Sequence, residues 1–141
     1  MWTTHSKIRC TNTLQLWCGI SVLCSGTVLT AAETISYHGY EHAIELKNKD
    51  VRVVLCPEVG GRVLEYSYRG SNVLYVSDQE KQWKPGDRPQ ASAGRFDIGP
   101  EFIIPRREVL WNGEWRVEIT GERSARLTSQ KDLATGVQLI R

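Results

Sequence analysis

The residues of this chain best suited to contact a polar ligand are two arginines, one glutamate and two tryptophans. They are Arg62, Trp83, Arg95, Glu101 and Trp111. An arginine presents a planar fork of donors that suits hydroxyl and carboxylate groups. A tryptophan offers an apolar ring face and a polar edge, which suits a sugar ring with C–H groups on one side. The combination predicts a carbohydrate-binding site, although every one of these residues also has a structural interpretation.

The two arginines could serve as structural ion-pair partners instead. Arg62 follows Gly60–Gly61, where missing side chains would let a ligand or another backbone approach closely. Its guanidinium could pair with Glu58 or Glu101, and this structural role is the one we favour. Arg95 could likewise form an ion pair with Asp97 or Glu101 on the surface instead of contacting a ligand.

Three tryptophans differ in the sequence that surrounds them. Trp115 opens a strand of alternating apolar and polar residues, so we expect its ring in the core. Trp83 and Trp111 lie beside loops, where a ring can either stack on a sugar or pack inward.

Other reactive residue types favour no catalytic or metal site. His38 and His42 have the i, i+4 spacing of a helical ligand pair, but Gly39 between them argues against a helix, so we expect two loop histidines. Cys56 ends an apolar run and is expected to pack as a small hydrophobe. The sequence has no phosphate-binding loop, dinucleotide fingerprint, nucleophile elbow or zinc-spaced cysteine set, so no cofactor and no metal are expected.

Residues 1–32 have the three parts of a secretory signal peptide. Lys7 and Arg9 form a positive start, residues 14–29 are uncharged and mostly apolar, and the small residues 30–32 suit a peptidase. The apolar run is shorter and more polar than a membrane-spanning helix requires. We therefore expect a secreted or periplasmic protein with no membrane span after cleavage, whose one remaining cysteine can form no internal disulfide.

Charge argues against nucleic acid as a partner. The chain has 18 basic and 16 acidic residues, and two of the basic ones lie in the leader, so residues 33–141 are neutral overall. Binding to a polyanion needs a surplus of lysine and arginine on one face.

The remaining 109 residues are enough for one domain, and their period-2 patterns predict an all-β, antiparallel sandwich. Expected strands are residues 43–47, 51–56, 62–69, 72–76, 115–120, 124–129 and 137–141. Asn112–Gly113 is expected to form a two-residue hairpin turn. Residues 76–109 are irregular but keep several apolar side chains, so we expect them to pack over a sheet.

The segment 136–141 forms an expected edge strand with an unmatched apolar face. Unpaired strand edges invite association. The unmatched edge therefore predicts that the sequence is a fragment of a longer protein, an early-terminated frame, or a partner in an oligomer formed through this edge.

Several segments resemble the galactose-mutarotase-like (aldose 1-epimerase) superfamily, particularly its secreted bacterial relatives of uncharacterised function. Residues 44–48, 53–66 and 70–75 are similar to the opening strands and glycine turns of those proteins, and residues 124–129 and 136–141 to a later strand pair. The resemblance implies that residues 33–141 are the N-terminal part of a large antiparallel sandwich that binds a sugar in a concave sheet.

The resemblance also implies an acid–base chemistry that this chain does not carry. Sugar mutarotation needs a base for the anomeric hydroxyl and an acid for the ring oxygen. The family's catalytic Glu and His have no counterpart here, so catalytic residues are unknown. The segment 93–101 matches the family's arginine-bearing sugar loop, with Gly94 in place of an asparagine before Arg95. We expect a carbohydrate-binding protein, or alternatively a non-catalytic sandwich that binds a glycan or another protein.

Overall fold

The computed structural model describes residues 32–88, 92–96, 98–100 and 102–141. The expected leader therefore lies outside the described residues, apart from Ala32. A five-stranded antiparallel sheet has the order β1-β2-β3-β4-β5, and β6 and β7 form a second antiparallel sheet. The strands are β1 (Glu33–Tyr37), β2 (Tyr40–Lys47), β3 (Val51–Cys56), β4 (Arg62–Tyr68), β5 (Ser71–Asn72), β6 (Arg116–Gly121) and β7 (Ser124–Thr128). The short helices are α1 (Asp78–Lys81) and α2 (Glu108–Trp111).

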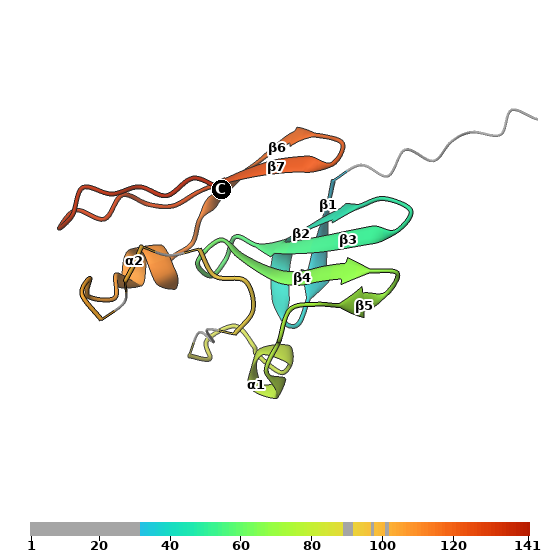
Figure 1. The fold of residues 1–141 in the computed structure, drawn as a ribbon, viewed down its shortest axis with the longest axis horizontal. Helices are drawn as coiled ribbons and strands as arrows, with labels where there is room; N and C mark the ends of the chain where they lie inside the picture. Colours follow the sequence, from blue (N-terminus) through green and yellow to red (C-terminus); the bar gives the residue numbers. More distant parts are fainter. Residues whose placement is uncertain (1–31, 89–91, 97, 101) are drawn as a thin grey trace, which may run out of the picture.

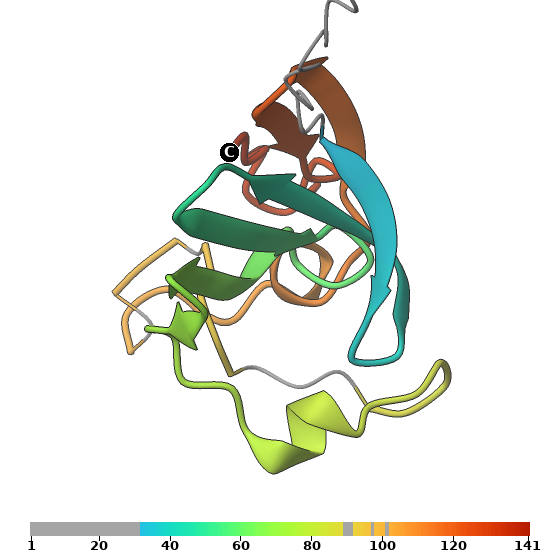
Figure 2. The same ribbon diagram turned by 90° about the vertical axis from the view of Figure 1, so that its right-hand side faces the viewer.

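These elements confirm the expected all-β, sandwich-like fold. The hairpin β6–β7 lies at one side of the five-stranded sheet and α1 lies at the other (Figure 1). A quarter turn of the molecule shows how far β1 and β2 curve around the sheet (Figure 2). The sheet therefore separates two regions of side-chain packing.

The first packing region lies on the α1 side and contains the stacked rings of Tyr40 and Trp83 with Cys56 and Leu64. The second lies on the β6–β7 side, where Trp115 and Leu127 pack against Ile44 and Leu55. Cys56 and Leu55 are neighbours in one strand, so their side chains point to opposite faces. The expectations that Cys56 and Trp115 pack in the core are both confirmed, since their exposed fractions are 0% and 1%.

Two tight turns differ from the sequence expectation. β1 and β2 join through His38–Gly39 at φ 50° and 83°, with Tyr37 facing Tyr40. The sequence does not indicate this hairpin, because the residues before the turn, Glu33–Tyr37, are mostly polar. Histidine is among the non-glycine residue types that adopt positive φ most often. Asn112–Gly113, in contrast, is no hairpin turn: Asn112 ends α2 with φ −124°, and the Gly113 N–H donates to the Glu108 carbonyl. Helical hydrogen bonds in residues 107–113 outweigh the local preference for a turn.

A β-bulge in β4 changes which side chains share a face. Val63 faces Leu55 and Glu65 faces Val54, so Leu64 is the extra residue. The simple alternation placed Arg62 with the tyrosines of β4, and this is wrong. Beyond the bulge the phase reverses, and Arg62 lies on the same face as Glu65.

The segment 76–109 packs only in part as expected. Trp83 is buried and Phe96 packs near Trp115, but the exposed fractions of Phe102 and Ile103 are 89% and 69%. Gly94 adds one bridge to Val63 in β4. The irregular segment therefore covers the sheet through a few residues and leaves an apolar loop in solvent.

The segment 137–141 runs beside β7. Leu127 and Arg141 exchange backbone hydrogen bonds of 2.8 and 2.9 Å, and Ile140 pairs with Thr128. Ile140 is 58% exposed. In the described part of the chain, no strand pairs with the outer edge of this segment.

Candidate functional site

One face of the five-stranded sheet carries charged and polar side chains that are buried. We call this the polar face and define it by Glu45, Arg52, Arg62, Glu65 and Ser67. The exposed fractions of Glu45 and Glu65 are only 6% and 8%. Burial of a charge is unfavourable unless the charge is paired, and paired groups of this kind often mark functional sites. The polar face is therefore the candidate site.

Arg52 is the centre of the outer part of the polar face. Its Nε lies 2.7 Å from Glu45 Oε1, and its Nη1 lies 2.6 Å from Glu65 Oε2. Lys47 forms a second ion pair with Glu45. The Ser67 hydroxyl donates to Glu65 Oε1 at 2.5 Å. One guanidinium thus joins two carboxylates from strands on either side of β3.

Tyr37 closes this network from β1. Its hydroxyl donates to Glu65 Oε2 at 2.8 Å, and the Arg52 guanidinium lies 5.4 Å from its ring centroid. Burial and the hydrogen bond to Glu65 raise the Tyr37 pKa well above its usual value. The phenol therefore stays protonated and remains a donor at physiological pH.

The titration of the ion pairs follows from the same contacts. Burial alone would raise the pKa of Glu45, but hydrogen bonds from Lys47 and Arg52 outweigh it and hold the pKa below its usual value. Burial would likewise lower the pKa of Arg52, and its contacts with Glu45 and Glu65 reverse the direction. Glu45 and Arg52 are therefore both charged at neutral pH.

The inner end of the polar face is a second ion pair under α1. Arg62 reaches Glu80 through two bonds of 2.8 and 2.9 Å, and the Tyr40 hydroxyl donates to the same carboxylate at 2.5 Å. Arg62 is 1% exposed and Glu80 0%. The structural partner of Arg62 is Glu80, and not Glu58, which instead accepts the backbone N–H of His42. The helical turn of α1 brings Glu80 back to the sheet, which sequence spacing alone does not reveal.

Residues of this chain, and not a ligand, lie against Gly60 and Gly61. A Cβ on Gly60 would lie 2.1 Å from the Trp111 carbonyl oxygen, and one on Gly61 would lie 2.4 Å from the Trp115 ring. The close approach expected at these glycines is made by residues of α2 and its following loop.

Two hollows open on the polar face. The turn hollow, of about 500 Å³, lies between the β1–β2 turn, the end of β5 and α1, and its lining includes Tyr37, His38, Asn72, Tyr75 and Asp78. The ring centroids of Tyr37 and His38 are 4.1 Å apart, and Tyr75 is 78% exposed. Burial lowers the pKa of His38, so its imidazole is neutral at pH 7.

The hairpin hollow, of about 470 Å³, lies between the β2–β3 and β4–β5 turns. Arg52, Glu65 and Ser67 form its floor, and Lys49 and Arg69 lie at its rim. The Tyr37–Glu65 hydrogen bond joins one residue of the turn hollow to one residue of the hairpin hollow. The two hollows are therefore neighbours on one surface.

The other residues predicted from the sequence lie elsewhere. Trp83 stacks on Tyr40 with centroids 4.3 Å apart. The guanidinium carbons of Arg95 and Arg106 lie 4.2 and 3.7 Å from the Trp111 ring centroid. Trp83 and Trp111 are only 9% and 8% exposed.

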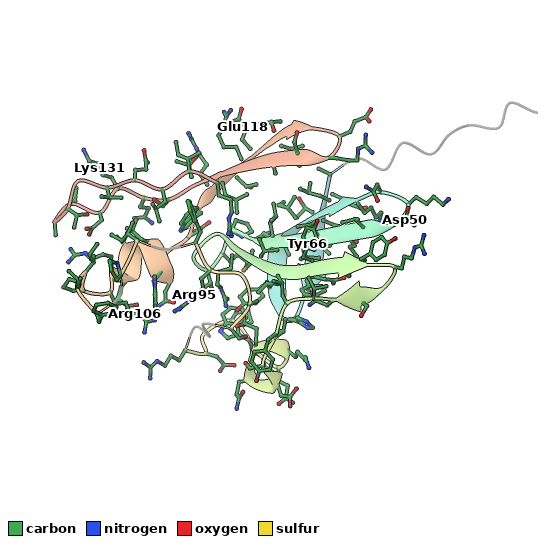
Figure 3. All side chains as sticks on the ribbon, in the orientation of Figure 1. Asp50, Tyr66, Arg95, Arg106, Glu118 and Lys131 are labelled. Carbon is green, nitrogen blue, oxygen red and sulfur yellow. The ribbon has the colours of Figure 1, made fainter. Side chains whose placement is uncertain are left out.

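This cluster is distant from the hairpin hollow, since Arg95 and Arg106 lie at the opposite end of the molecule from Asp50 (Figure 3). Glu101 and Asp97 lie outside the described residues. The structure therefore places Arg62 on the polar face, and none of the described candidates lines either hollow. Trp83 packs against Gly39 of the β1–β2 turn.

A separate hollow of about 430 Å³ between β2 and β6 gathers the residue types that acid–base chemistry uses. His42, Glu58 and Glu114 line it. His42 lies within β2 and not in a loop as expected. Among the described residues, no group of three or more His, Cys, Asp or Glu side chains could hold a metal ion.

The carboxylate of Glu65 is fully engaged within the polar face. Both oxygens of Glu65 already accept hydrogen bonds, one from Ser67 and the other from Tyr37 and Arg52. A carboxylate so engaged is a weak base, because a general base needs a free oxygen within reach of the substrate proton.

Most of the polar face was not predicted from the sequence. Its signal was present in the alternation of Arg52, Glu65 and Ser67 with apolar neighbours, but such a pattern ordinarily indicates a solvated strand face. Tyr37 of β1 reaches Glu65 on this face, and the pairing of β1 with β2 has a register shift between Ile35 and Tyr37.

Comparison with protein-family models, curated proteins and solved structures gave no match for this chain. Over the described residues, the structure holds no helix with the length and apolar character needed to cross a membrane.

Proposed function

We propose that this chain is a secreted carbohydrate-binding protein related to the mutarotase-like sandwiches, and that its sugar site is the polar face. The observation that carries the proposal is the partly buried network of Arg52, Glu65 and Tyr37 beside two open hollows. Sugars present many hydroxyl groups, and a fixed set of charged donors and acceptors is suited to orient them.

The turn hollow supplies the apolar part of sugar recognition. Tyr75 is largely exposed, and the paired rings of Tyr37 and His38 line the same hollow. Aromatic rings bind the C–H face of a sugar, while Asp78 and Lys81 offer polar atoms nearby. This mixture supports a sugar over a purely apolar ligand.

The proposed activity is binding without catalysis. The oxygens of Glu65 are engaged by Ser67, Tyr37 and Arg52, which makes this carboxylate a weak base. Polarimetry of freshly dissolved glucose or galactose distinguishes the two activities, and we expect no acceleration of anomer exchange. Acceleration that disappears in His42→Ala would instead assign catalysis to the hollow between β2 and β6.

Binding is tested by calorimetric titration of the protein with a panel of neutral and acidic oligosaccharides. For the best ligand, Tyr75→Ala should weaken affinity about threefold to tenfold, which is the range expected for one lost aromatic contact. Tyr66→Ala is the matched control, because the Tyr66 ring is also exposed, to 47%, but lies on the opposite face of the sheet. Flat titrations across the whole panel would refute the proposal.

A protein-binding role is the second candidate. Phe102, Ile103 and Leu133 are 89%, 69% and 90% exposed, and exposed apolar side chains often mark contact surfaces between proteins. The ion pair between Arg107 and Asp132 ties the segments that carry them. Flat glycan titrations would leave this second surface as the remaining candidate.

A further inference from the structure

The hairpin hollow carries more positive than negative charge. Its charged lining consists of four cations and two anions, namely Lys47, Lys49, Arg52 and Arg69 against Asp50 and Glu65. Behind this lining Glu45 pairs with Lys47 and Arg52, so the local excess is one positive charge. The turn hollow is different, because its Asp78 and Lys81 form an ion pair of 3.0 Å and balance each other. The two neighbouring hollows therefore suit ligand groups of different charge.

Two of these cations have donors left for a ligand. Lys49 is exposed and forms no hydrogen bond or ion pair with any residue that the structure describes. Arg52 uses Nε and Nη1 on the two carboxylates, and within the described chain its Nη2 has no hydrogen bond. A guanidinium with a free edge beside an ammonium group is suited to an oxyanion.

The rim of the hairpin hollow is held in position. The side-chain oxygen of Asn48 accepts from the backbone N–H groups of Asp50 and Val51 at 2.9 and 2.8 Å, which fixes the turn that carries Lys49. Arg69 Nε lies 3.3 Å from Asp50 Oδ1. Because these groups are already ordered, an anion binds with less loss of side-chain freedom.

The two hollows share a boundary at the hydrogen bond between Tyr37 and Glu65. A ligand that crosses this bond places one unit against the rings of the turn hollow and the next against the cations of the hairpin hollow. We propose that the polar face recognises an acidic oligosaccharide, and that the hairpin hollow binds the carboxylate or sulfate of one sugar unit. This inference rests on the proposed sugar-binding function and specifies its ligand class.

The test uses one oligosaccharide in a charged and a neutral form. Calorimetry compares a galacturonic acid tetramer with its fully methyl-esterified form at 50 mM NaCl. The acid should bind at least about fivefold more tightly, since each exposed ion pair contributes a few-fold. The double variant Lys49→Gln with Arg69→Gln should remove most of this preference, because it weakens binding of the acid much more than binding of the ester.

A matched control and a salt series isolate the electrostatic contribution. Lys131→Gln removes an exposed lysine at the far end of the molecule and should change neither affinity. Raising NaCl to 500 mM should weaken binding of the acid and not of the ester, because screening acts on charge pairs. A sulfated galactan tetramer in a parallel titration shows which anionic group is preferred.

Failure of this inference and failure of the proposed sugar-binding function give different results. Equal binding of acid and ester, or a preference that survives the double variant, overturns the inference and leaves the sugar-binding function in place. Absence of binding by every oligosaccharide overturns both. Competition by inorganic sulfate against the acid tetramer, but not against the ester, would support the anion site directly.

Discussion

The buried pair of Arg62 and Glu80 gives the most direct test of the physical reasoning. Replacing Glu80 with alanine removes an acceptor that is fully buried and bonded by Arg62, Tyr40 and Ser92. The guanidinium of Arg62, itself 1% exposed, would then lie in the interior without a counter-charge. Removal of one partner from such a pair costs about 3–5 kcal/mol.

This cost is large compared with the stability of a small domain. Native domains are stable by about 5–15 kcal/mol, so Glu80→Ala should lower the urea midpoint by more than about 1 M, given slopes of about 1–3 kcal/mol per M. Asp78→Ala is the matched control, since it removes an exposed pair with Lys81 on the same helix. That change should cost less than about 1 kcal/mol.

Tryptophan fluorescence in urea measures both variants, because Trp83 lies close to the pair and stacks on Tyr40. A double variant, Arg62→Met with Glu80→Leu, should recover most of the loss, since a packed apolar pair can replace a buried ion pair. Equal and small effects of Glu80→Ala and Asp78→Ala would refute the reasoning.

The same pair predicts a dependence on pH. Burial would raise the pKa of Glu80, but hydrogen bonds from Arg62 and Tyr40 outweigh it, so the folded pKa lies below the usual value. A lowered carboxyl pKa stabilises the fold above the unfolded pKa of about 4.3, and the contribution is lost as pH falls through the folded pKa. The difference in stability between wild type and Glu80→Gln should therefore shrink with acidification below about pH 4.5.

Three further predictions concern single residues. Burial raises the pKa of the Cys56 thiol to about 12, so the folded protein should not react with a thiol reagent at pH 8, and the same thiol should react fully in urea. Gly61 and Gly70 both have positive φ, but Gly61→Ala places a Cβ 2.4 Å from the Trp115 ring, whereas the Cβ of Gly70→Ala meets nothing within 4 Å. Thermal unfolding should therefore show a greater loss of stability for Gly61→Ala than for Gly70→Ala. Self-association through the outer edge of residues 137–141 should appear in sedimentation as a rise in mass with concentration, and Ile140→Lys should reduce it, while an unchanged profile would exclude this edge.

The strands were largely predictable because their apolar residues alternate. The expected segment 51–56 coincides with β3, and 124–129 differs from β7 by one residue. β1 was missed, because Glu33–Tyr37 is mostly polar and exposed and pairs only along the curved end of the sheet. Local propensity does not encode such curvature.

The candidate site was much less predictable than the fold. Arg62 was identified, but its partner Glu80 is supplied by a one-turn helix 18 residues away. The residues Tyr37, Arg52 and Glu65 come from three strands and become one network only through register. Trp83 and Trp111 attracted attention as large aromatic side chains near loops, yet the loops fold so that both rings pack against other side chains.

The single extra residue in β4 lets the strand bury one more leucine without changing the faces of its outer half. Val63 packs toward Trp115 while Glu65 and Ser67 point to the other side. If the bulge closed with Leu64 retained, the pairing of the outer half would shift by one position and exchange its two sides. Tyr66 would then lie opposite Arg52 in place of Ser67, and Glu65 would leave the polar face. Deletion of Leu64, in contrast, would restore regular pairing and keep both faces, with the loss of one fully buried side chain.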